Sequence, residues 1–345
     1  MVLQVEIFKQ LGDFRLEAQF ETDGSPLALL GGSGSGKSLT LRCIAGILTP
    51  DAGRITLGGR TLFDSAAGID LPPQRRRVGY LFQNYALFPH MSVAENVAVA
   101  IPKGRRRTEV PALLEKLHLT AVAHQRPGQI SGGEQQRTAL ARILGSGAEA
   151  LLLDEPFSAL DSYLKWRVEQ ELADVLADFA GPVVWVSHDR SEVYRNCPRV
   201  CVMDGGRSQG AVDMEDLFRD PVTVSAARLS GCKNYVDAVP FEDCVDIFDW
   251  KLRLFCGRTP PPETNTVGLR SHHIRFAAPG SENSFSCTVE RLIQDVFETI
   301  LLLRPVGAQP DAPLLRMELK KVLSPPRAGE RVTVSIAPGD ILLLH

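Results

Sequence analysis

The sequence lacks several features that would indicate particular classes of protein. Among its 345 residues there is no apolar run long enough to span a bilayer and no signal peptide. The seven cysteines form neither zinc-type C-x-x-C pairs nor a dense framework, so reduced thiols in a cytosolic protein are expected. A net charge of −3 gives no basic field that would draw the whole molecule onto nucleic acid. If the protein works at a membrane, we expect other chains to supply the spanning segments.

A glycine-rich stretch near the N-terminus organises the chain, because it fits the phosphate-binding pattern G-x-x-x-x-G-K-[ST]. A short apolar strand at 27–30 precedes it and a helix follows. Glycines let backbone N–H groups converge on phosphate oxygens, and the helix N-terminus adds the positive end of its dipole. We expect Lys37 to bind the β- and γ-phosphates and the Ser38 hydroxyl to hold Mg²⁺. The predicted phosphate-binding residues are Gly31, Gly32, Ser33, Gly34, Ser35, Gly36, Lys37, Ser38 and Leu39.

Further motifs downstream suit ATP chemistry. The apolar strand at 151–153 ends in Asp154 and Glu155, which suits a carboxylate that supports Mg²⁺ followed by one that polarises a hydrolytic water. Gln83 and His188 each follow another predicted strand. The stretch Ser131, Gly132, Gly133, Glu134 and Gln135 opens a helix and could bind an anion there. Taken alone, that stretch is equally well an ordinary helix cap, and a lone histidine is more often structural.

In this order, the motifs resemble the ATP-binding cassette (ABC) family over residues 1–215. The resemblance implies an ATPase with ATP and Mg²⁺, in which Glu155, His188 and Gln83 are catalytic. Ser38, Gln83 and Asp154 would hold the metal. In that family two cassettes face each other head to tail, so residues 131–135 would contact the ATP of a second copy. The loop that crosses this interface is matched by Ser158, Ala159, Leu160 and Asp161.

Two departures from the family pattern concern details. The family stacks adenine on an aromatic residue in the first strand pair, where this chain has Leu11, leaving Phe14 or Phe8 as substitutes. The signature stretch begins with Ile130 and carries Glu134 before Gln135. Neither departure affects the hydrolysis chemistry.

The pattern of strands and helices predicts two domains. Residues 1–26 read as an antiparallel strand pair, and strands at 27–30, 78–82, 150–153, 183–186 and 200–203 alternate with helices. This pattern indicates a P-loop α/β cassette at 1–215 with a mainly parallel sheet, a helical subdomain at about 84–146 and an N-terminal antiparallel sheet. A linker helix is expected at 216–234. Short β runs between Pro- and Gly-rich turns then predict a small all-β domain, OB- or TOBE-like, at 235–345.

Several stretches favour an importer. Residues 82–93 resemble the segment by which importer cassettes meet a permease, with Leu87, Phe88 and Met91 as exposed apolar residues; burial in the helical lobe is the alternative. The all-β domain is similar to the regulatory barrels of bacterial importers. Residues 10–14, 231–234 and 268–274 resemble cassettes for molybdate or sulfate.

We therefore expect the ATP-hydrolysing subunit of a bacterial ABC importer for an inorganic oxyanion, peripheral on the cytoplasmic face of the inner membrane. Its expected partners are a second copy of itself, permease subunits and, indirectly, a solute-binding protein, with no nucleic acid. The alternatives are import of a sugar, a polyamine or iron, a cassette ATPase that acts on nucleic acid or ribosomes, or a nucleotide-binding regulator without turnover.

Basic residues outside these motifs carry two further expectations. Arg75–Arg77 and Arg105–Arg107 are expected to be solvated edges or loops rather than a nucleic-acid site. Arg270 and Arg275, beside Ser271, motivate the hypothesis that the all-β domain senses intracellular oxyanion. The pair His272 and His273 has no third ligand at hand, so a packing role is expected for it.

Overall fold

The computed structural model describes residues 1–158, 162–321 and 325–345, and it divides the chain into two compact units, Met1–Met214 and Glu215–His345. Each unit is described by itself. Among the described residues, no helix combines the length and the apolar character that crossing a membrane requires. All seven cysteines are free thiols.

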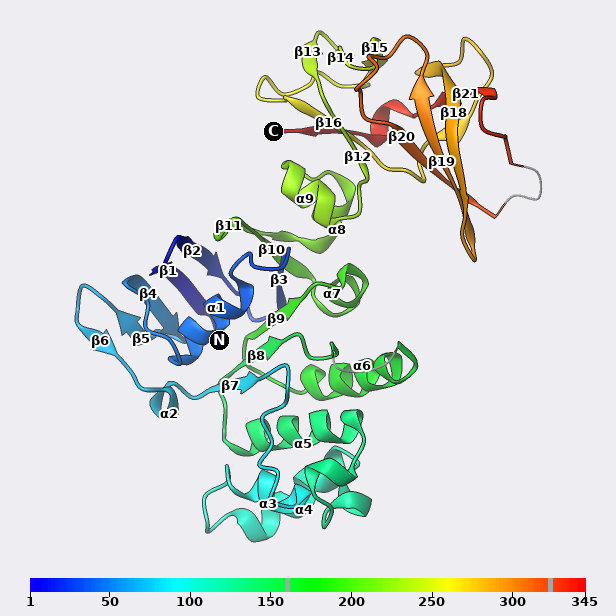
Figure 1. The fold of residues 1–345 in the computed structure, drawn as a ribbon. Coiled ribbons are helices and arrows are strands. Elements are labelled where there is room, and N and C mark those ends of the chain that lie inside the picture. Colours follow the sequence, from blue (N-terminus) through cyan, green and yellow to red (C-terminus); the bar gives the residue numbers. More distant parts are fainter. Residues whose placement is uncertain (159–161, 322–324) are drawn as a thin grey trace. The chain divides into compact units, whose positions relative to one another are not determined.

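The first unit is built on a single eleven-stranded sheet with the order β6-β5-β4-β1-β2-β11-β10-β3-β9-β8-β7 (Figure 1). Its strands are β1 (Leu3–Leu11), β2 (Phe14–Glu21), β3 (Leu27–Gly31), β4 (Ala52–Leu57), β5 (Arg60–Asp64), β6 (Ile69–Asp70), β7 (Val78–Leu81), β8 (Ala150–Asp154), β9 (Val183–Ser187), β10 (Arg199–Asp204) and β11 (Arg207–Asp213).

The sheet is mixed. Strands β7, β8, β9, β3 and β10 pair in parallel, as the alternation of strands and helices predicts. Strands β1, β2, β4, β5 and β6 pair antiparallel. The antiparallel pairing expected for the N-terminal strands is confirmed. Strand β11 joins the two parts into one sheet, because it pairs antiparallel with β10 and meets β2 in parallel at Arg207 and Glu17.

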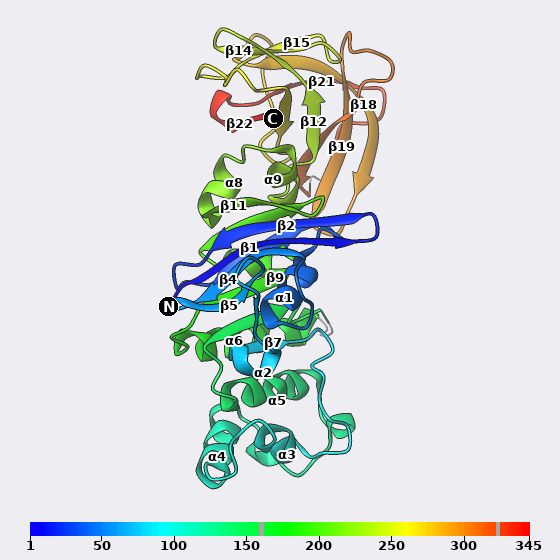
Figure 2. The same ribbon diagram turned by 90° about the vertical axis from the view of Figure 1, so that its left-hand side faces the viewer.

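Helices cover this sheet and form a helical group beyond its β7 edge. The helices are α1 (Lys37–Ala45), α2 (Pro73–Arg76), α3 (Val93–Ala98), α4 (Arg106–Lys116), α5 (Gly132–Gly145), α6 (Ser162–Ala177) and α7 (Arg190–Asn196), with 3-10 turns at Thr120–Val122 and Pro127–Gln129. Figures 1 and 2 show α3, α4 and α5 gathered beyond β7, and α5 packs directly on that strand. These helices lie within the stretch of about 84–146 for which a helical subdomain is expected.

The three arginines before β7 do not share one environment. Arg75 and Arg77 are exposed, as expected, but Arg76 is completely buried. Its guanidinium donates to the carbonyl oxygens of Cys43 at 2.8 Å and Ile44 at 2.9 Å, in the last turn of α1. The Cys43 carbonyl also accepts from the backbone N–H of Gly46 at 3.2 Å, whereas the Ile44 carbonyl, at the end of the helix, depends on a donor from outside it. The expectation of a solvated run is wrong for Arg76, which closes the C-terminus of α1.

The second unit is an all-β domain preceded by short helices. We expected a linker helix at 216–234, but Pro221 cannot continue a helix and two helices form, α8 (Met214–Arg219) and α9 (Val224–Leu229). The strands are β12 (Asn234–Asp237), β13 (Val239–Phe241), β14 (Cys244–Ile247), β15 (Leu252–Phe255), β16 (Thr266–Leu269), β17 (Arg275–Phe276), β18 (Ser284–Gln294), β19 (Glu298–Pro305), β20 (Leu315–Lys320), β21 (Arg331–Ser335) and β22 (Ile341–Leu344), with a 3-10 turn at Pro338–Asp340.

These strands form three sheets, β12-β16-β22, β13-β14-β15 and β17-β21-β18-β19-β20, around one apolar core. Trp250 is fully buried in that core, and its Nε1 donates to the carbonyl of Pro313 at 2.7 Å. The all-β character expected for this part of the chain is confirmed.

The side chain of Arg270 is buried and hydrogen-bonded within this unit. Its guanidinium is 5% exposed and donates to the carbonyl oxygens of Ser230 and Phe218 and to the Ser230 hydroxyl. A cation already committed to buried carbonyl groups is not open to a solute anion. The hypothesis that Arg270 senses an oxyanion is therefore wrong in its choice of residue.

Candidate functional site

The phosphate-binding pattern lies where β3 passes into α1. Every residue of β3 is buried, and the loop that follows needs glycine at two positions. A Cβ on Gly31 would stand 2.3 Å from the carbonyl oxygen of Met203 and 2.5 Å from the Ser35 hydroxyl. Gly36 has φ of 100°, a left-handed conformation that favours glycine. Leu39 is the third residue of α1, so the predicted phosphate-binding residues all belong to this strand, loop and first helical turn.

Lys37 is folded back into the loop. It is 7% exposed, and its Nζ donates to the carbonyl oxygens of Gly31 and Gly32, each at 2.8 Å. Burial lowers the pKa of Lys37, while the carboxylates of Glu155 and Asp154 act in the opposite direction. The ammonium group therefore lies inside the loop, close to the start of α1. The first backbone N–H groups of a helix have no acceptor within the helix.

Ser38 and Asp154 meet although 116 positions separate them in the sequence. The Ser38 Oγ donates to Asp154 Oδ1 at 2.7 Å, and Asp154 ends β8 with only 7% of its surface exposed. The second carboxylate oxygen, Oδ2, accepts a hydrogen bond from the Tyr80 hydroxyl, also at 2.7 Å. Sequence reasoning missed Tyr80, because a tyrosine within an apolar strand looks like an ordinary core residue.

Glu155 and His188 stand beside each other at the same edge of the sheet. Glu155 Oε1 lies 3.3 Å from His188 Nδ1, and the two side chains are 24% and 66% exposed. The backbone of Glu155 adopts a left-handed φ of 47°, which is unusual for a residue other than glycine. Its N–H donates to the carbonyl of Val186 at 2.9 Å, which fixes the turn after β8. The predicted water-activating carboxylate therefore sits on a constrained and partly open turn.

The oxygen donors at this edge fit Mg²⁺. Leu81 of β7 pairs with Leu153 of β8, so the exposed Gln83 leaves the sheet at the same edge as Asp154. Ser38 gives its single proton to Asp154, which leaves the lone pairs of its oxygen for a cation. Hydroxyl, carboxylate and amide oxygens are the ligands that Mg²⁺ takes from proteins, usually together with water and substrate phosphates.

The signature stretch forms the N-terminus of α5. Ser131 is the N-cap, and its hydroxyl and backbone N–H both donate to the Glu134 carboxylate, at 2.7 and 2.8 Å. The bond from the Ser131 hydroxyl lowers the pKa of Glu134. Gln135 Nε2 donates to the carbonyl of Pro127 at 3.0 Å. Within the described part of the chain, no hydrogen bond or ion pair joins 131–135 to the phosphate loop.

The predicted interface loop is described only at its start. The Ser158 hydroxyl donates to the carbonyl of Glu155 at 3.0 Å, so this loop follows directly on the turn at Glu155. Ala159, Leu160 and Asp161 lie outside the described residues.

The candidates for stacking on adenine lie in the β1–β2 hairpin. Leu11 is exposed, and the ring of Phe8 lies 5.1 Å below the Arg15 guanidinium. Phe14 lies beside the phosphate loop, since a Cβ on Gly36 would be 3.3 Å from its Cζ. Among these three, Phe14 has the place nearest to the phosphate loop.

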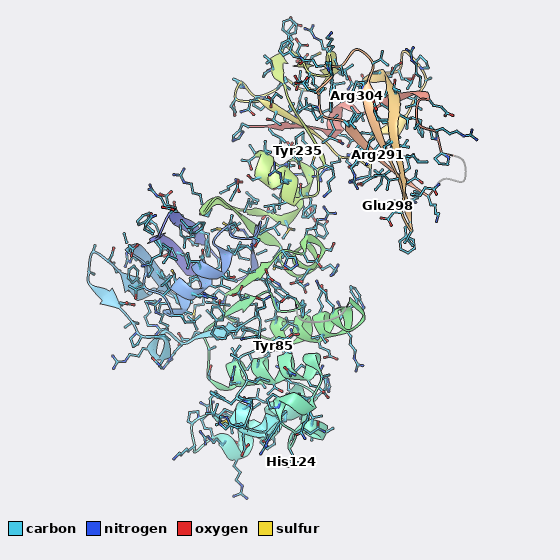
Figure 3. The ribbon with its side chains drawn as sticks, viewed as in Figure 1. Tyr85, His124, Tyr235, Arg291, Glu298 and Arg304 are labelled. Carbon is cyan, nitrogen blue, oxygen red and sulfur yellow. The ribbon has the colours of Figure 1, made fainter. Side chains whose placement is uncertain are left out.

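The segment at 82–93, which is expected to meet a permease, is held by hydrogen bonds from two side chains, Arg142 and Asn96. Tyr85 and Ala86 both have a left-handed φ, and Arg142 of α5 donates to their carbonyl oxygens at 3.0 and 2.8 Å (Figure 3 labels Tyr85). The fully buried Asn96 accepts from the N–H of Phe88 at 2.8 Å and donates to its carbonyl. Phe88 is 40% exposed, whereas Leu87 and Met91 are half-buried. Phe88 is thus the apolar side chain that this rigid segment presents.

Comparison with known proteins agrees with this geometry. Residues 19–158 match the family model described as ABC transporter. A molybdenum import ATP-binding protein of Paramagnetospirillum magneticum is 39% identical over 223 residues, and the alignment covers 64% of this chain and 61% of that protein. A molybdate/tungstate import ATP-binding protein of Pyrococcus horikoshii is 36% identical over 321 residues, or 89% of each chain.

A solved structure also matches the first part of the chain. A dimeric ATP-binding cassette in a post-hydrolysis state, bound to ADP and Pi, superimposes with a TM-score of 0.51 and 26% identity. The match covers 62% of this chain and 99% of that one. The cassette fold and the ABC-type ATPase class expected from the motifs are confirmed at the level of the family. The chain belongs to the ABC transporter family of ATP-binding proteins.

Proposed function

We propose that this chain is the ATP-hydrolysing subunit of a bacterial ABC importer for an inorganic oxyanion. One observation carries the proposal. Ser38 and Asp154 are bonded at the end of the phosphate loop, and Glu155 and His188 stand at the same edge of the sheet. This arrangement places a phosphate cradle, oxygen donors for a metal and a carboxylate for a water molecule together, as phosphoryl transfer to water requires.

Each residue then has a distinct task. Lys37 turns from the loop carbonyls to the β- and γ-phosphates, alongside the N–H groups of residues 31–39. Ser38, Asp154 and Gln83 would hold Mg²⁺, which would neutralise charge at the phosphates. Glu155 orients the attacking water and takes its proton, and His188 contacts the γ-phosphate.

We infer that the working unit is a head-to-tail pair. Ser131, Gly132, Gly133, Glu134 and Gln135 of one copy would close the ATP site of the other, with the loop 158–161 between them. The N-terminus of α5 offers N–H groups and a positive dipole end for a phosphate. The dimeric state of the similar cassette supports this assembly. An isolated monomer is expected to bind ATP and to hydrolyse it poorly.

The partners and the cargo follow from the family and its named members. We propose that residues 1–215 form the nucleotide-binding domain, that 216–234 link it to a regulatory domain at 235–345, and that Phe88 seats in a permease subunit on the cytoplasmic face of the membrane. Relatives named for molybdenum and for molybdate/tungstate import support an oxyanion as cargo.

Substitution of Glu155 by glutamine tests the central assignment. The variant keeps the shape and the neutral hydrogen-bonding capacity of the side chain but cannot accept a proton. ATP binding should persist, the closed dimer should accumulate with ATP, and hydrolysis should fall at least about 100-fold. Glu149→Gln is the matched control, because Glu149 is a partly buried carboxylate just before the opposite end of β8. Unchanged hydrolysis in Glu155→Gln would refute the assignment.

The cargo is tested separately, in a complex with the permease and the solute-binding protein. The ATPase rate should rise with molybdate, tungstate or sulfate and stay basal with spermidine or Fe³⁺. Stimulation by spermidine or Fe³⁺ alone would replace the oxyanion by another cargo and leave the ATPase assignment intact.

A further inference from the structure

Tyr80 occupies an unusual place for a core residue. It lies in β7 opposite Leu152 of β8, is 9% exposed, and packs its ring against Phe82 with 4.3 Å between the centroids. Its hydroxyl donates to Asp154 Oδ2 at 2.7 Å. Because Ser38 occupies Oδ1 at the same distance, the two oxygens of Asp154 are held by hydroxyl groups from two different elements, β7 and α1.

Two donors remove the freedom that a lone carboxylate retains. The terminal torsion of an aspartate is broad and roughly two-fold, so a single hydrogen bond leaves the carboxylate plane free to turn. With both oxygens bonded, the plane of Asp154 is fixed before any ligand arrives.

We propose that Tyr80 is a positioning residue of the ATPase site, which acts on the metal through the orientation of Asp154. The inference rests on the proposed function, because it assumes that Asp154 supports Mg²⁺ beside ATP. It also gives β7 two roles at this site. Tyr80 of β7 holds the carboxylate of Asp154, and the segment that follows β7 carries Gln83. Groups that orient metal-binding side chains typically change metal affinity about 10- to 100-fold when removed.

The test compares Mn²⁺ binding, used as a probe for Mg²⁺, in the full chain with a non-hydrolysable ATP analogue by electron paramagnetic resonance. Tyr80→Phe and Tyr80→Met both lack the hydroxyl but differ in shape. Each should weaken Mn²⁺ binding by about 10- to 100-fold. Binding of the ATP analogue in EDTA should stay within twofold of the unmodified chain, since the loop that holds the phosphates is untouched.

Tyr235→Phe is the matched control. Its hydroxyl also makes a 2.7 Å bond, to the carbonyl of Cys232, and it lies on β12 of the all-β unit (Figure 3). This variant should bind Mn²⁺ like the unmodified chain. If either Tyr80 variant, folded as judged by its melting temperature, binds Mn²⁺ within twofold of the unmodified chain, the inference is overturned. If the unmodified chain itself shows no ATP-dependent Mn²⁺ binding, the proposed function fails instead.

Discussion

Replacement of Arg76 by methionine should destabilise the first unit more than any neighbouring surface change. Arg76 is fully buried, and its guanidinium donates to the carbonyl oxygens of Cys43, Ile44 and Leu71 at 2.8, 2.9 and 2.7 Å. Methionine keeps most of the apolar bulk but leaves the carbonyl oxygens of Ile44 and Leu71 without this donor, while that of Cys43 keeps the N–H of Gly46 at 3.2 Å. The additional ion pair with Asp70 adds little, because that carboxylate is 44% exposed.

The magnitude follows from those acceptors. A buried polar group left without a partner costs about 1–3 kcal/mol, and the losses at Ile44 and Leu71 are not fully additive because they share one donor. We therefore expect the free energy of unfolding to fall by about 2–4 kcal/mol. This is a large part of the total stability of an ordinary domain, about 5–15 kcal/mol.

Urea unfolding followed by circular dichroism measures this loss, and hydrogen exchange of the amides in residues 37–45 shows whether it is centred on α1. Arg75→Met is the control, because the adjacent Arg75 is exposed and should change stability by no more than about 0.5 kcal/mol. A loss below about 1 kcal/mol in Arg76→Met would show that water replaces the guanidinium and would refute the reasoning.

Three further changes probe the site and its supports. Gly36→Ala should abolish ATP binding and lower stability, measured by calorimetry and thermal melting, since its Cβ would approach Leu16 Cδ1 to 2.7 Å at a left-handed φ; binding like the unmodified chain would contradict it. Ser131→Ala removes a helix cap and should cost about 1 kcal/mol in urea unfolding at neutral pH. Part of this cost comes from the bond between the Ser131 hydroxyl and the Glu134 carboxylate, which lowers the pKa of Glu134; that part is complete above the unfolded pKa near 4.5 and is lost as the pH falls through the lower folded pKa, so an equal cost in acid would contradict it. Asn96→Leu should speed proteolysis of residues 84–92, and an unchanged cleavage rate would show that Asn96 does not fasten this segment.

Most of the fold could be predicted from local sequence patterns. The phosphate loop and the helix after it depend on contiguous residues, so spacing alone identifies them. The order of the motifs allowed Ser38 and Asp154 to be paired, although the contact spans 116 positions. Short strands without a clear alternation, such as β13 with Pro240 inside it, escaped prediction because their pairing depends on tertiary contacts.

The errors share one physical cause, which is that burial of a polar group is decided by distant partners. Arg76 looks like the centre of a solvated run until the end of α1 is placed beside it. Arg270 looks like a cation open to anions until the carbonyls of Phe218 and Ser230 surround it. Tyr80 looks like core until the end of β8 brings Asp154 to its hydroxyl.

Helix α5 has a mechanical consequence that neither of its ends reveals alone. Ser131 caps its first turn, and Arg142 near its last turn grips the carbonyls of Tyr85 and Ala86. With 14 residues, the helix is about 21 Å long and stiff along its axis. A displacement of the first turn would therefore also move Arg142, and with it the loop at 85–88 that Arg142 holds. The helix thus connects the residues that we propose to contact a phosphate, at its first turn, with the loop that carries Phe88.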